Sequence, residues 1–532
     1  MPRSVMEHSF AEVPRANIPR SSFNRSHGYK TTFDADYLVP VLVDDMVPGD
    51  TFNVNMSFFA RLATPLFPIM DNMYLESFAF FIPYRLVWDN WEKMHGAQDD
   101  PGDSIDFTVP KLFGASALNG IGDLADYMGI PYTVVPDNTP VSALPFRAYR
   151  LTWNEWFRDQ NLQNSVSVMT DNGPDTNAES GQHDVPLKRG KRHDYFTSAL
   201  PWPQKGSAVS VPLGSTAPVM AATGWMAGDD VHVLNADNKS NWVDMNSGVP
   251  TKLEFGATAA GSANLLVDLS GATASTINDL RLAFQTQRLL ERDARSGTRY
   301  NELILAHFGV TVPDFRVQRP EFLGGGSTPI NVTPVAQTSG QATPVANDTM
   351  GHLAAFGTVS DTHGFTYSAT EHGILMVLVN LRADLTYSQG LERYWSKATR
   401  YDFYYPVLAQ IGEQSILNKE IWHANIPGTG ASQDEGVFGY TERYNEYRYK
   451  PARITSLFRP DAAGTLAAWH LSEDFAALPT LGATFIEANL SVPLDRAIAI
   501  ATEPHLIFDA YFNMQCARPM PLFGVPGNLD HF

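Results

Sequence analysis

Cysteine is almost absent from this chain of 532 residues, in which Cys516 is the only one. A single thiol excludes an intramolecular disulfide and any metal site built from several thiolates. Long apolar runs are also missing, since the longest aliphatic run is ILMVLV at 374–379, and a membrane-spanning helix needs about 20 apolar residues. The first residues show no apolar stretch typical of a secretory signal. We therefore expect no membrane insertion and synthesis in a reducing cytoplasm.

Charged side chains are scarce as well. They make up 18% of the chain, below the roughly 25% that is usual for soluble proteins. Aromatic residues contribute 11%, and surfaces with few charges and many aromatics are typical of subunit interfaces. A large aromatic-rich β protein fits this composition equally well. The net charge of −19 differs from that of proteins that bind nucleic acid unaided, so any such role must be local.

Catalytic signatures are absent too. The chain has no GxxxxGK[ST] phosphate loop, no HExxH and no GxSxG. The run Gly324-Gly325-Gly326 lacks a following helix pattern and predicts a flexible turn. His363 and His372 with Glu371 have a spacing that matches no common metal site. We predict no catalytic residue, no cofactor and no metal, although a carboxylate pair of the glycosidase type could still form in space.

Short β-branched or aromatic runs bounded by Pro, Gly and Asp predict strands near both ends of the chain. These runs lie at 37–43, 51–60, 74–83, 373–381, 451–458, 496–501 and 505–514. In the last run, alternate residues from Leu506 to Met514 are apolar, which predicts a strand with one more deeply buried face.

Helices and long loops are expected between the strands. Thr152 and Glu155 have capping-box spacing ahead of a helix at 154–163, and a second helix is predicted at 279–295. A short one is predicted at 388–397, while 206–279 and 324–350 have loop composition. The pattern indicates an all-β core with helical insertions, in the manner of a jelly roll with long inserted loops. A two-domain α+β protein remains an alternative.

Three segments are candidates for contact with nucleic acid. Residues 1–30 form a polar arm in which cations outnumber carboxylates; we single out Arg15, Arg20, Arg25 and Lys30. The segment 440–450 interleaves tyrosines with Arg443 and Arg448, which suits single-stranded DNA. Tyrosines packed at subunit contacts, with nearby glutamates neutralising the arginines, are the favoured alternative there. The basic loop 187–193 fits phosphate contact and plain solvation equally.

The segment 206–279 is rich in Gly and acidic, with seven carboxylates against two lysines. This composition disfavours contact with DNA and predicts an outward-facing insertion. Trp225 and Trp242 are its candidate receptor contacts, because aromatic rings serve sugars and protein partners alike. A small core of the insertion is the more ordinary role for both.

Long segments of the chain resemble the major capsid proteins of the Microviridae, in the gokushovirus-like branch of small circular single-stranded DNA bacteriophages. The matching segments lie at 20–52, 64–72, 80–96, 144–163, 193–206, 277–310, 319–332, 390–421 and 438–459. They include FFIPYRLVWDNWEKMHG and FGYTERYNEYRYKPARITSLFR and keep the family's order. The resemblance is interrupted mainly at 207–275 and 333–370.

The resemblance implies a single eight-stranded viral jelly roll that assembles with itself into a T=1 icosahedral shell around circular single-stranded DNA. It implies an extended internal arm at 1–30, a capsid domain at 31–516, a surface protrusion at 206–279 and an extended C-terminal tail at 517–532. Implied partners are a small basic DNA-binding virion protein and an unknown bacterial surface receptor. The protein would belong to the virion, assembled in the cytoplasm of the infected bacterial host. A carbohydrate-binding or carbohydrate-cleaving sandwich, and a bacterial structural protein without a genome, are the competing classes.

Overall fold

The structure is a computed structural model, and the chain forms two compact units in it. One unit is Met1–Pro203 with Val312–Phe532, and the other is Gln204–Thr311. The described residues are 19–113, 120–131, 141–176, 185–209, 219–221, 233–234, 240–241, 265–267, 277–295, 306–308, 318–338, 351, 353–423 and 431–523.

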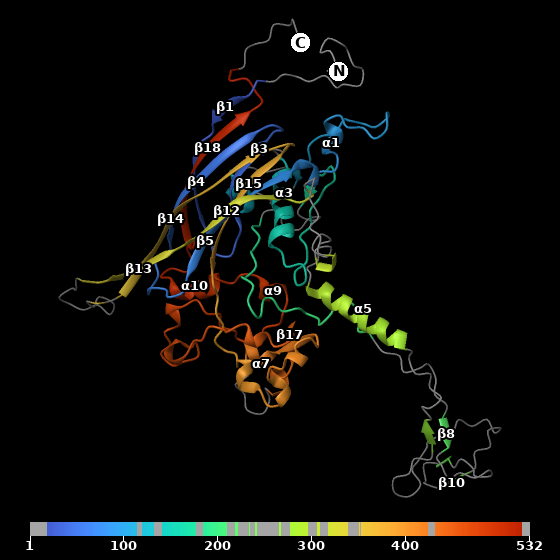
Figure 1. The fold of residues 1–532 in the computed structure, drawn as a ribbon. Coiled ribbons are helices and arrows are strands. Elements are labelled where there is room, and N and C mark those ends of the chain that lie inside the picture. Colours follow the sequence, from blue (N-terminus) through green and yellow to red (C-terminus); the bar gives the residue numbers. More distant parts are fainter. Residues whose placement is uncertain are drawn as a thin grey trace, which may run out of the picture. The chain divides into compact units, whose positions relative to one another are not determined.

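The first unit is built on two antiparallel β-sheets, seen as packed arrows in Figure 1. The six-stranded sheet has the order β1-β18-β4-β14-β13, with β2 also paired to β18, and the four-stranded sheet has the order β12-β5-β15-β3. The strands are β1 Ser21–Asn24, β2 His27–Phe33, β3 Val39–Met46, β4 Thr51–Leu62, β5 Met73–Pro83, β12 Glu321–Pro329, β13 Asn331–Ala336, β14 Leu353–Ser368, β15 Gly373–Ala383 and β18 Leu506–Arg518.

Eight of these strands have the connectivity of a jelly roll. The orders β2-β18-β4-β14 and β3-β15-β5-β12 face each other, and successive strands alternate between the sheets except from β5 to β12. This double Greek key is the jelly-roll arrangement, so the predicted fold class is confirmed. The long connection between β5 and β12 contains the second unit.

The main core lies between the two sheets. In β4 and β18 every second side chain is buried, as period-two alternation requires of a sheet with one covered face. Phe58 of β4 stacks on Phe508 of β18 with 5.9 Å between ring centroids. The alternation predicted from Leu506 to Met514 is therefore confirmed.

The central strands β5 and β15 of the four-stranded sheet are buried on both faces. Nearly every residue of β15 is buried, which explains why its sequence is a continuous apolar run instead of an alternating one. Its second face packs into a separate cluster that includes Trp88, Phe146 and Tyr149, the last two from α3 Leu144–Thr152. The insertion between β5 and β12 thus contributes a layer of the core.

The remaining elements of the first unit are short. They comprise α1 Trp91–Met94, β6 Leu112–Phe113, α2 Leu124–Tyr127, a π-helical turn Trp153–Phe157, β7 Asp175–Thr176, β16 Glu413–Leu417, α7 Asn418–Ile421, α8 Ala431–Asp434, β17 Val437–Glu442, α9 Ala483–Ile486 and α10 Ser491–Ala497. Single 3₁₀ turns lie at Tyr84–Leu86, Arg393–Ser396, Arg400–Asp402, Pro406–Leu408, Asn445–Tyr447, Ser456–Phe458 and Ala467–Trp469. A third apolar cluster, which includes Phe196, Ile416 and Phe485, joins β16, α7 and α9.

The second unit contains α5 Ile277–Arg295 and two short antiparallel pairs. The pairs are β8 Val219–Ala221 with β11 Leu265–Val267, and β9 Val233–Leu234 with β10 Ser240–Asn241. The helix predicted at 279–295 is confirmed.

The helix predicted to begin after Thr152 begins earlier, at Leu144. Thr152 lies inside the helical run, and its hydroxyl donates a hydrogen bond to the carbonyl of Ala148 at 2.8 Å instead of capping an N-terminus. The capping-box spacing was a coincidence of sequence, because buried side chains such as Phe146 dock the preceding turns onto the sheet. The helix predicted at 388–397 is reduced to the 3₁₀ turn Arg393–Ser396.

Two predicted strands are wrong. The segment 451–458 contains only the 3₁₀ turn Ser456–Phe458, and 496–501 contains the end of α10 and one isolated bridge at Ile498. Neither run extends a sheet, and Leu457 and Ile500 are exposed. An apolar run becomes a strand only where a neighbouring strand is available for pairing.

The glycine run 324–326 lies in strand β12 and not in a turn, so the loop predicted at 324–350 is wrong for its first residues. Gly325 lies against the carbonyl oxygen of Ser77 on β5, and Gly326 lies against the ring of His363 on β14. A side chain would collide at either position. Glycine is present here because two neighbouring strands approach its backbone closely.

The predicted segment boundaries stay predictions. Residues 1–18 of the arm lie outside the described residues, while its later part forms β1 and the start of β2. In the segment 206–279 the structure describes the four short strands, the start of α5 and 206–209. The tail 517–532 begins at the end of β18, and 524–532 lie outside the described residues. Within the described residues, no helix is both long and apolar enough to span a membrane.

Gly325→Ala should destabilise the sandwich by about 1–3 kcal/mol, because the new methyl group would overlap the Ser77 carbonyl and push β12 away from β5. Denaturant unfolding of the purified chain measures this. Gly482→Ala is the matched control: its backbone is extended and no atom lies within 4 Å of the added methyl group. Equal stability of the two variants would contradict the close approach.

Candidate nucleic-acid and subunit interfaces

Three of the four cations predicted near the N-terminus are engaged within the chain. Arg20 donates to the carbonyl of Gly49 at 2.6 Å. Arg25 forms a two-bond ion pair with Asp44, at 2.5 and 2.9 Å. Lys30 pairs with Asp509 at 3.0 Å, and its side chain is 77% exposed. Arg20 and Lys30 are exposed, whereas Arg25 is half-buried.

Three other predicted contact residues, Arg15, Trp225 and Trp242, lie outside the described residues. Their assignment to DNA or to a receptor stays a prediction.

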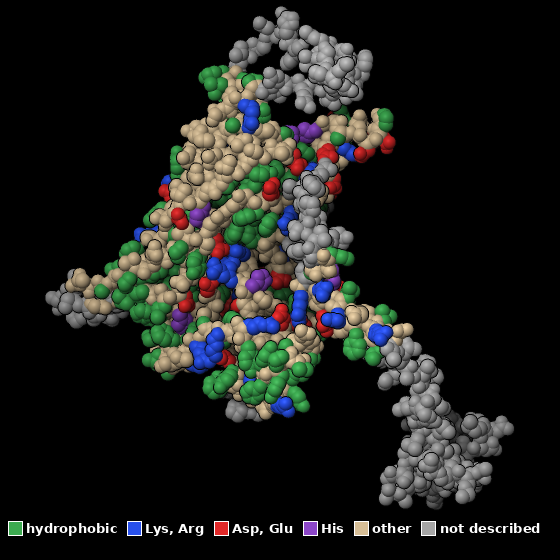
Figure 2. Space-filling model, viewed as in Figure 1, with side chains coloured by type: hydrophobic (Ala, Val, Ile, Leu, Met, Phe, Trp, Pro, Cys, Tyr) green, Lys and Arg blue, Asp and Glu red, His purple; other side chains and the backbone are tan. Residues whose placement is uncertain are grey.

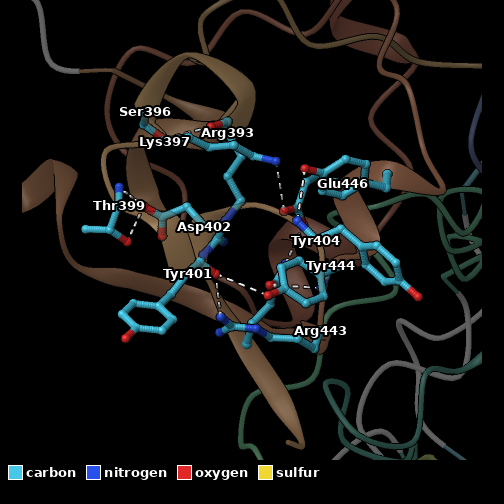
Figure 3. A network of polar contacts seen from close by, with 12 residues as sticks. Arg393, Ser396, Lys397, Thr399, Tyr401, Asp402, Tyr404, Arg443, Tyr444 and Glu446 are labelled. Atoms are coloured by element: carbon cyan, nitrogen blue, oxygen red, sulfur yellow. Dashed lines mark hydrogen bonds and ion pairs between the residues drawn. The ribbon is translucent and has the colours of Figure 1, made fainter. Parts of the chain in front are cut away.

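The tyrosine-rich segment 440–450 folds back on residues 393–405 (Figure 3). Arg443 and the hydroxyl of Tyr444 both donate to the carbonyl of Tyr401, at 3.1 and 3.2 Å. Arg448 pairs with Glu442. The pair of Arg448 with Glu442 agrees with the favoured alternative, whereas Arg443 meets a carbonyl and Glu446 lies near Lys397. Contact of Arg443 and Arg448 with phosphate stays a prediction.

An exposed group of aromatic and aliphatic side chains surrounds this fold-back, and we name it the aromatic surface. Trp395, for example, is 66% exposed. Figure 2 shows hydrophobic side chains gathered over the part of the first unit where α7 and β17 lie. The members are Tyr394, Trp395, Tyr401, Phe403, Tyr404, Tyr405, Val407, Ile411, Tyr447 and Leu457. Contiguous apolar side chains of this kind mark protein–protein contacts.

A cavity of about 390 Å³ adjoins the aromatic surface, lined in part by Trp395, Tyr447 and Glu392. Glu392 accepts hydrogen bonds from Lys450 at 2.7 Å and from Arg453. The hydrogen bond from Arg453 and the bond from Lys450 lower the pKa of Glu392 to about 2. The carboxylate holds the segment 450–453 against residues 390–393.

Glu420 lines the same cavity but behaves in the opposite way. It pairs with Arg393 at 3.0 Å and accepts a hydrogen bond from the hydroxyl of Tyr195 at 2.9 Å. Burial raises the pKa of Glu420 because it disfavours the charged form. The cavity wall is thus held by ion pairs that leave the aromatic rings on its outside free for a partner.

Three cations of the basic loop 187–193 are paired within the chain, so the loop is not a plainly solvated one, and its contact with phosphate stays a prediction. Arg189 and Arg192 pair with Glu76 of β5, and Lys191 pairs with Glu473 at 2.6 Å. Burial raises the pKa of Glu76, but the arginines outweigh this effect and hold the pKa below its usual value. A charge on a buried strand requires such partners, and the loop supplies them.

Metal ligation is not visible in the described residues, which contain no cluster of three or more His, Cys, Asp or Glu with suitable placement. His363 contacts the hydroxyl of Ser77 at 2.6 Å, and Glu371 pairs with Arg85 at 2.7 Å. His372 lies 5.0 Å from the ring of His95. The three residues serve separate contacts.

Sequence reasoning missed the aromatic surface, although a signal was present. Residues 394–405 read YWSKATRYDFYY, a density of rings far above that of the rest of the chain. Its first residues belong to the helix predicted at 388–397, and residues 398–405 match the periodicity of neither a strand nor a helix. Aromatics without periodicity are better taken as interface candidates.

Comparisons with known proteins cover almost the whole chain. A family model described as capsid protein (F protein) matches residues 11–528. Capsid protein VP1 of Bdellovibrio phage phiMH2K is 44% identical over 552 aligned positions, which cover 99% of this chain and 98% of the relative. Capsid protein VP1 of Chlamydia phage 1 is 42% identical, covering 98% of each chain. Capsid protein VP1 of Spiroplasma virus 4 is 34% identical, covering 98% of this chain and 97% of the relative.

Glu392→Gln should reduce the pH dependence of stability in acid. The folded pKa near 2 lies below the ordinary value of 4.5, so the stabilisation is complete above about pH 4.5 and is lost as the pH falls towards 2. Lys450 and Arg453 are exposed and screened, so we expect about 1–2 kcal/mol. Denaturant unfolding between pH 2 and 6 measures it. Glu435→Gln, whose carboxylate is 65% exposed, should follow the wild type; equal profiles for all three proteins would contradict the role of Glu392.

Proposed function

Because this chain belongs to the capsid protein (F protein) family, it is a structural virion protein and not an enzyme, and we propose that its copies close into a T=1 icosahedral shell around a circular single-stranded DNA genome. The predicted relationship to the gokushovirus-like Microviridae is confirmed by the three phage relatives. The observation that carries the proposal is the family match over residues 11–528. Assembly takes place in the cytoplasm of the infected bacterium.

The sandwich serves as the rigid tile of this shell. Its two packed sheets fix the tile's shape, and the aromatic surface supplies contact area to a neighbour. Obligate interfaces of this kind bury on the order of 2,000–5,000 Å² and are rich in aromatics. The C-terminal tail adds a strap across an adjacent subunit. Met520, Leu522 and Phe523 are exposed at its start, and its prolines keep it extended.

Contact with the packaged DNA is local in this proposal. Arg15, Arg20, Arg25 and Lys30 face the genome with the help of Arg443 and Arg448. Lys30 is mostly exposed, while Arg25 already has a carboxylate partner. A chain with a net charge of −19 cannot neutralise a genome by itself. A small basic DNA-binding virion protein therefore supplies most of the counter-charge.

The acidic segment 206–279 projects outward and contacts a bacterial surface receptor. Its acidity disfavours contact with DNA, and the unit Gln204–Thr311 is compact by itself. A protrusion of this kind can vary without disturbing the tile. Trp225 and Trp242 are its candidate receptor contacts.

The purified particles should be closed shells of one size that contain single-stranded DNA. Electron microscopy measures the shape and size of the particles, and the amount of nuclease-protected DNA measures their content. Substituting Arg15, Arg20, Arg25 and Lys30 by Ala should release DNA at a lower salt concentration, because phosphate contacts are lost. Each such contact contributes about 0.7 to the slope with which the logarithm of single-strand affinity falls against the logarithm of salt concentration. Open sheets or aggregates in place of shells would contradict the assembly proposal. Shells with unchanged DNA retention would contradict only the arm.

The yield and melting temperature of assembled shells also test whether the C-terminal tail is a strap. A chain that ends at Arg518 keeps all of β18, so any loss of shell yield or of melting temperature belongs to the tail. Unchanged yield and melting would show that the tail is not a strap.

Replacing residues 210–275 by a short Gly-Ser linker should leave assembly intact and abolish adsorption to the host. Adsorption is measured as the loss of free particles on mixing with host cells. Particles in which Trp225 and Trp242 are changed to Ala are the matched variant, because they keep the backbone of the segment. Adsorption equal to that of wild type in the linker variant would refute the receptor role.

A further inference from the structure

The imidazole of His363 lies between the two sheets of the sandwich. His363 belongs to β14 of the six-stranded sheet, and its side chain is 11% exposed. Its ring centroid lies 5.0 Å from that of Phe58 on the neighbouring strand β4. On β12 of the other sheet, a Cβ atom added at Gly326 would overlap the ring. The glycine run 324–326 therefore leaves the space that this imidazole occupies.

Both ring nitrogens of His363 contact the four-stranded sheet. Nδ1 lies 2.6 Å from the hydroxyl oxygen of Ser77 on β5, and Nε2 lies 3.0 Å from the hydroxyl oxygen of Thr328 on β12. The Thr328 hydroxyl donates its own proton to the carboxylate of Asp361 at 2.7 Å. The Thr328 oxygen therefore accepts from Nε2–H, and Nδ1 accepts from the Ser77 hydroxyl. A neutral imidazole thus satisfies every group in this chain of hydrogen bonds.

We name these four side chains, Ser77, Thr328, Asp361 and His363, the inter-sheet network. Two of them belong to each sheet, so the hydrogen bonds connect β14 to β5 and β12. The side chains around the network are apolar, and they include Met56, Ala79, Phe365 and Val377. The network is therefore a polar connection between two sheets that otherwise pack through apolar side chains.

A second proton on the ring is incompatible with this arrangement. Nδ1–H would have to donate to the Ser77 oxygen, and the proton of the Ser77 hydroxyl would lose its acceptor. Ser77 is only 3% exposed, and a buried hydroxyl without an acceptor is costly. The cavity beside the ring has a volume of about 10 Å³, which leaves room for no more than one water molecule and for no counter-ion.

The charge on a protonated ring would be only partly compensated. Among the charged groups of the described residues, Asp361 is the one that acts on His363, and its carboxylate lies 3.8 Å from Nε2 and is 48% exposed. The elements β4, β5, β12 and β15 present Phe58, Ser77, Thr328 and Val377 to this site, and none of these side chains is charged. Burial lowers the pKa of His363 because it disfavours the imidazolium, and Asp361 offsets part of this effect.

We propose that the inter-sheet network is an acid-sensitive switch, in which a proton on His363 breaks the contact of β14 with β5 and β12 and loosens the sandwich. At neutral pH the network is intact and the two sheets form a rigid tile. In mild acid the same tile loses a connection between its sheets. The consequence for a shell rests on the proposed function, because each copy in the shell would carry the same switch.

The proton balance gives the direction of the pH effect. In the unfolded chain His363 binds a proton near the ordinary pKa of 6.5, whereas in the folded chain it binds one only at lower pH. Unfolding between these two pKa values takes up a proton, so the stabilisation is complete above about pH 6.5 and is lost as the pH falls. One such proton raises the unfolding equilibrium constant by up to about ten-fold per pH unit.

Denaturant unfolding of the purified full-length chain between pH 5 and 8 tests the switch. The unfolding equilibrium constant of the wild type should rise more steeply towards acid than that of His363→Gln, by up to about ten-fold per pH unit, because glutamine keeps a donor and an acceptor but takes up no proton. His470 and His505 are also buried, but both proteins contain them. Equal profiles for the wild type and His363→Gln would overturn the switch.

His27→Gln is the matched control, because His27 is an exposed histidine on β2 of the same sheet. It should keep the steep profile of the wild type. A second measurement needs no variant: exchange of the carbon-bound ring hydrogen, followed by mass spectrometry across pH, gives the pKa of His363 in the wild-type chain. A value at or above 6.5 would overturn the proposal.

Filled particles test the consequence for the shell. Wild-type particles should expose their DNA to nuclease at a higher pH than particles of His363→Gln. The same onset in both kinds of particle would show that the switch does not act in the shell. A chain that forms no closed shells with DNA would overturn the proposed function and leave the switch measured in the purified chain intact.

Discussion

The structure depends on one constraint: the apolar strands β5 and β15 at the centre of the four-stranded sheet β12-β5-β15-β3 have to be covered on both faces. The six-stranded sheet covers one face, and the chain between β5 and β12 covers the other with α3 and the loop 187–193. Glu76 on β5 is buried at this second face and requires cations. Arg189 and Arg192 come from the covering loop to meet it. The same ion pairs therefore hold the covering loop against the sheet.

These ion pairs within the tile limit the number of cations that remain for contact with DNA. Many arginines that could have met DNA are bound to carboxylates of their own chain, as Arg25 is to Asp44 and Arg448 to Glu442. A shell made of such tiles would contact its genome at repeated points, while the aromatic surface is kept for contacts between tiles. Weak contacts of each kind gain strength through the number of copies.

Some elements were predictable from sequence because their signal is local. The alternation from Leu506 to Met514 and the apolar run of β15 each match one periodicity, and both form strands as predicted. The helix start predicted from the capping-box spacing at Thr152 is wrong, because docking onto the sheet decides where the helix begins. The strand predicted at 496–501 is wrong, because a run forms a strand only where it finds a neighbouring strand to pair with. The turn predicted at Gly324–Gly326 is wrong for a related reason. The glycines alone do not show that Ser77 and His363 of neighbouring strands approach them closely.

The sequence by itself determined the jelly-roll class, the family and the absence of familiar catalytic motifs, since these depend on periodicity and on residues in a fixed order. Only the tertiary structure decided which cations are free. Lys188, Arg189, Lys191 and Arg192 are one basic run in sequence, yet Glu76 and Glu473 pair with three of them from distant strands and loops. The physical reason is that ion pairing depends on distance in space, and the partners lie more than a hundred residues away along the chain.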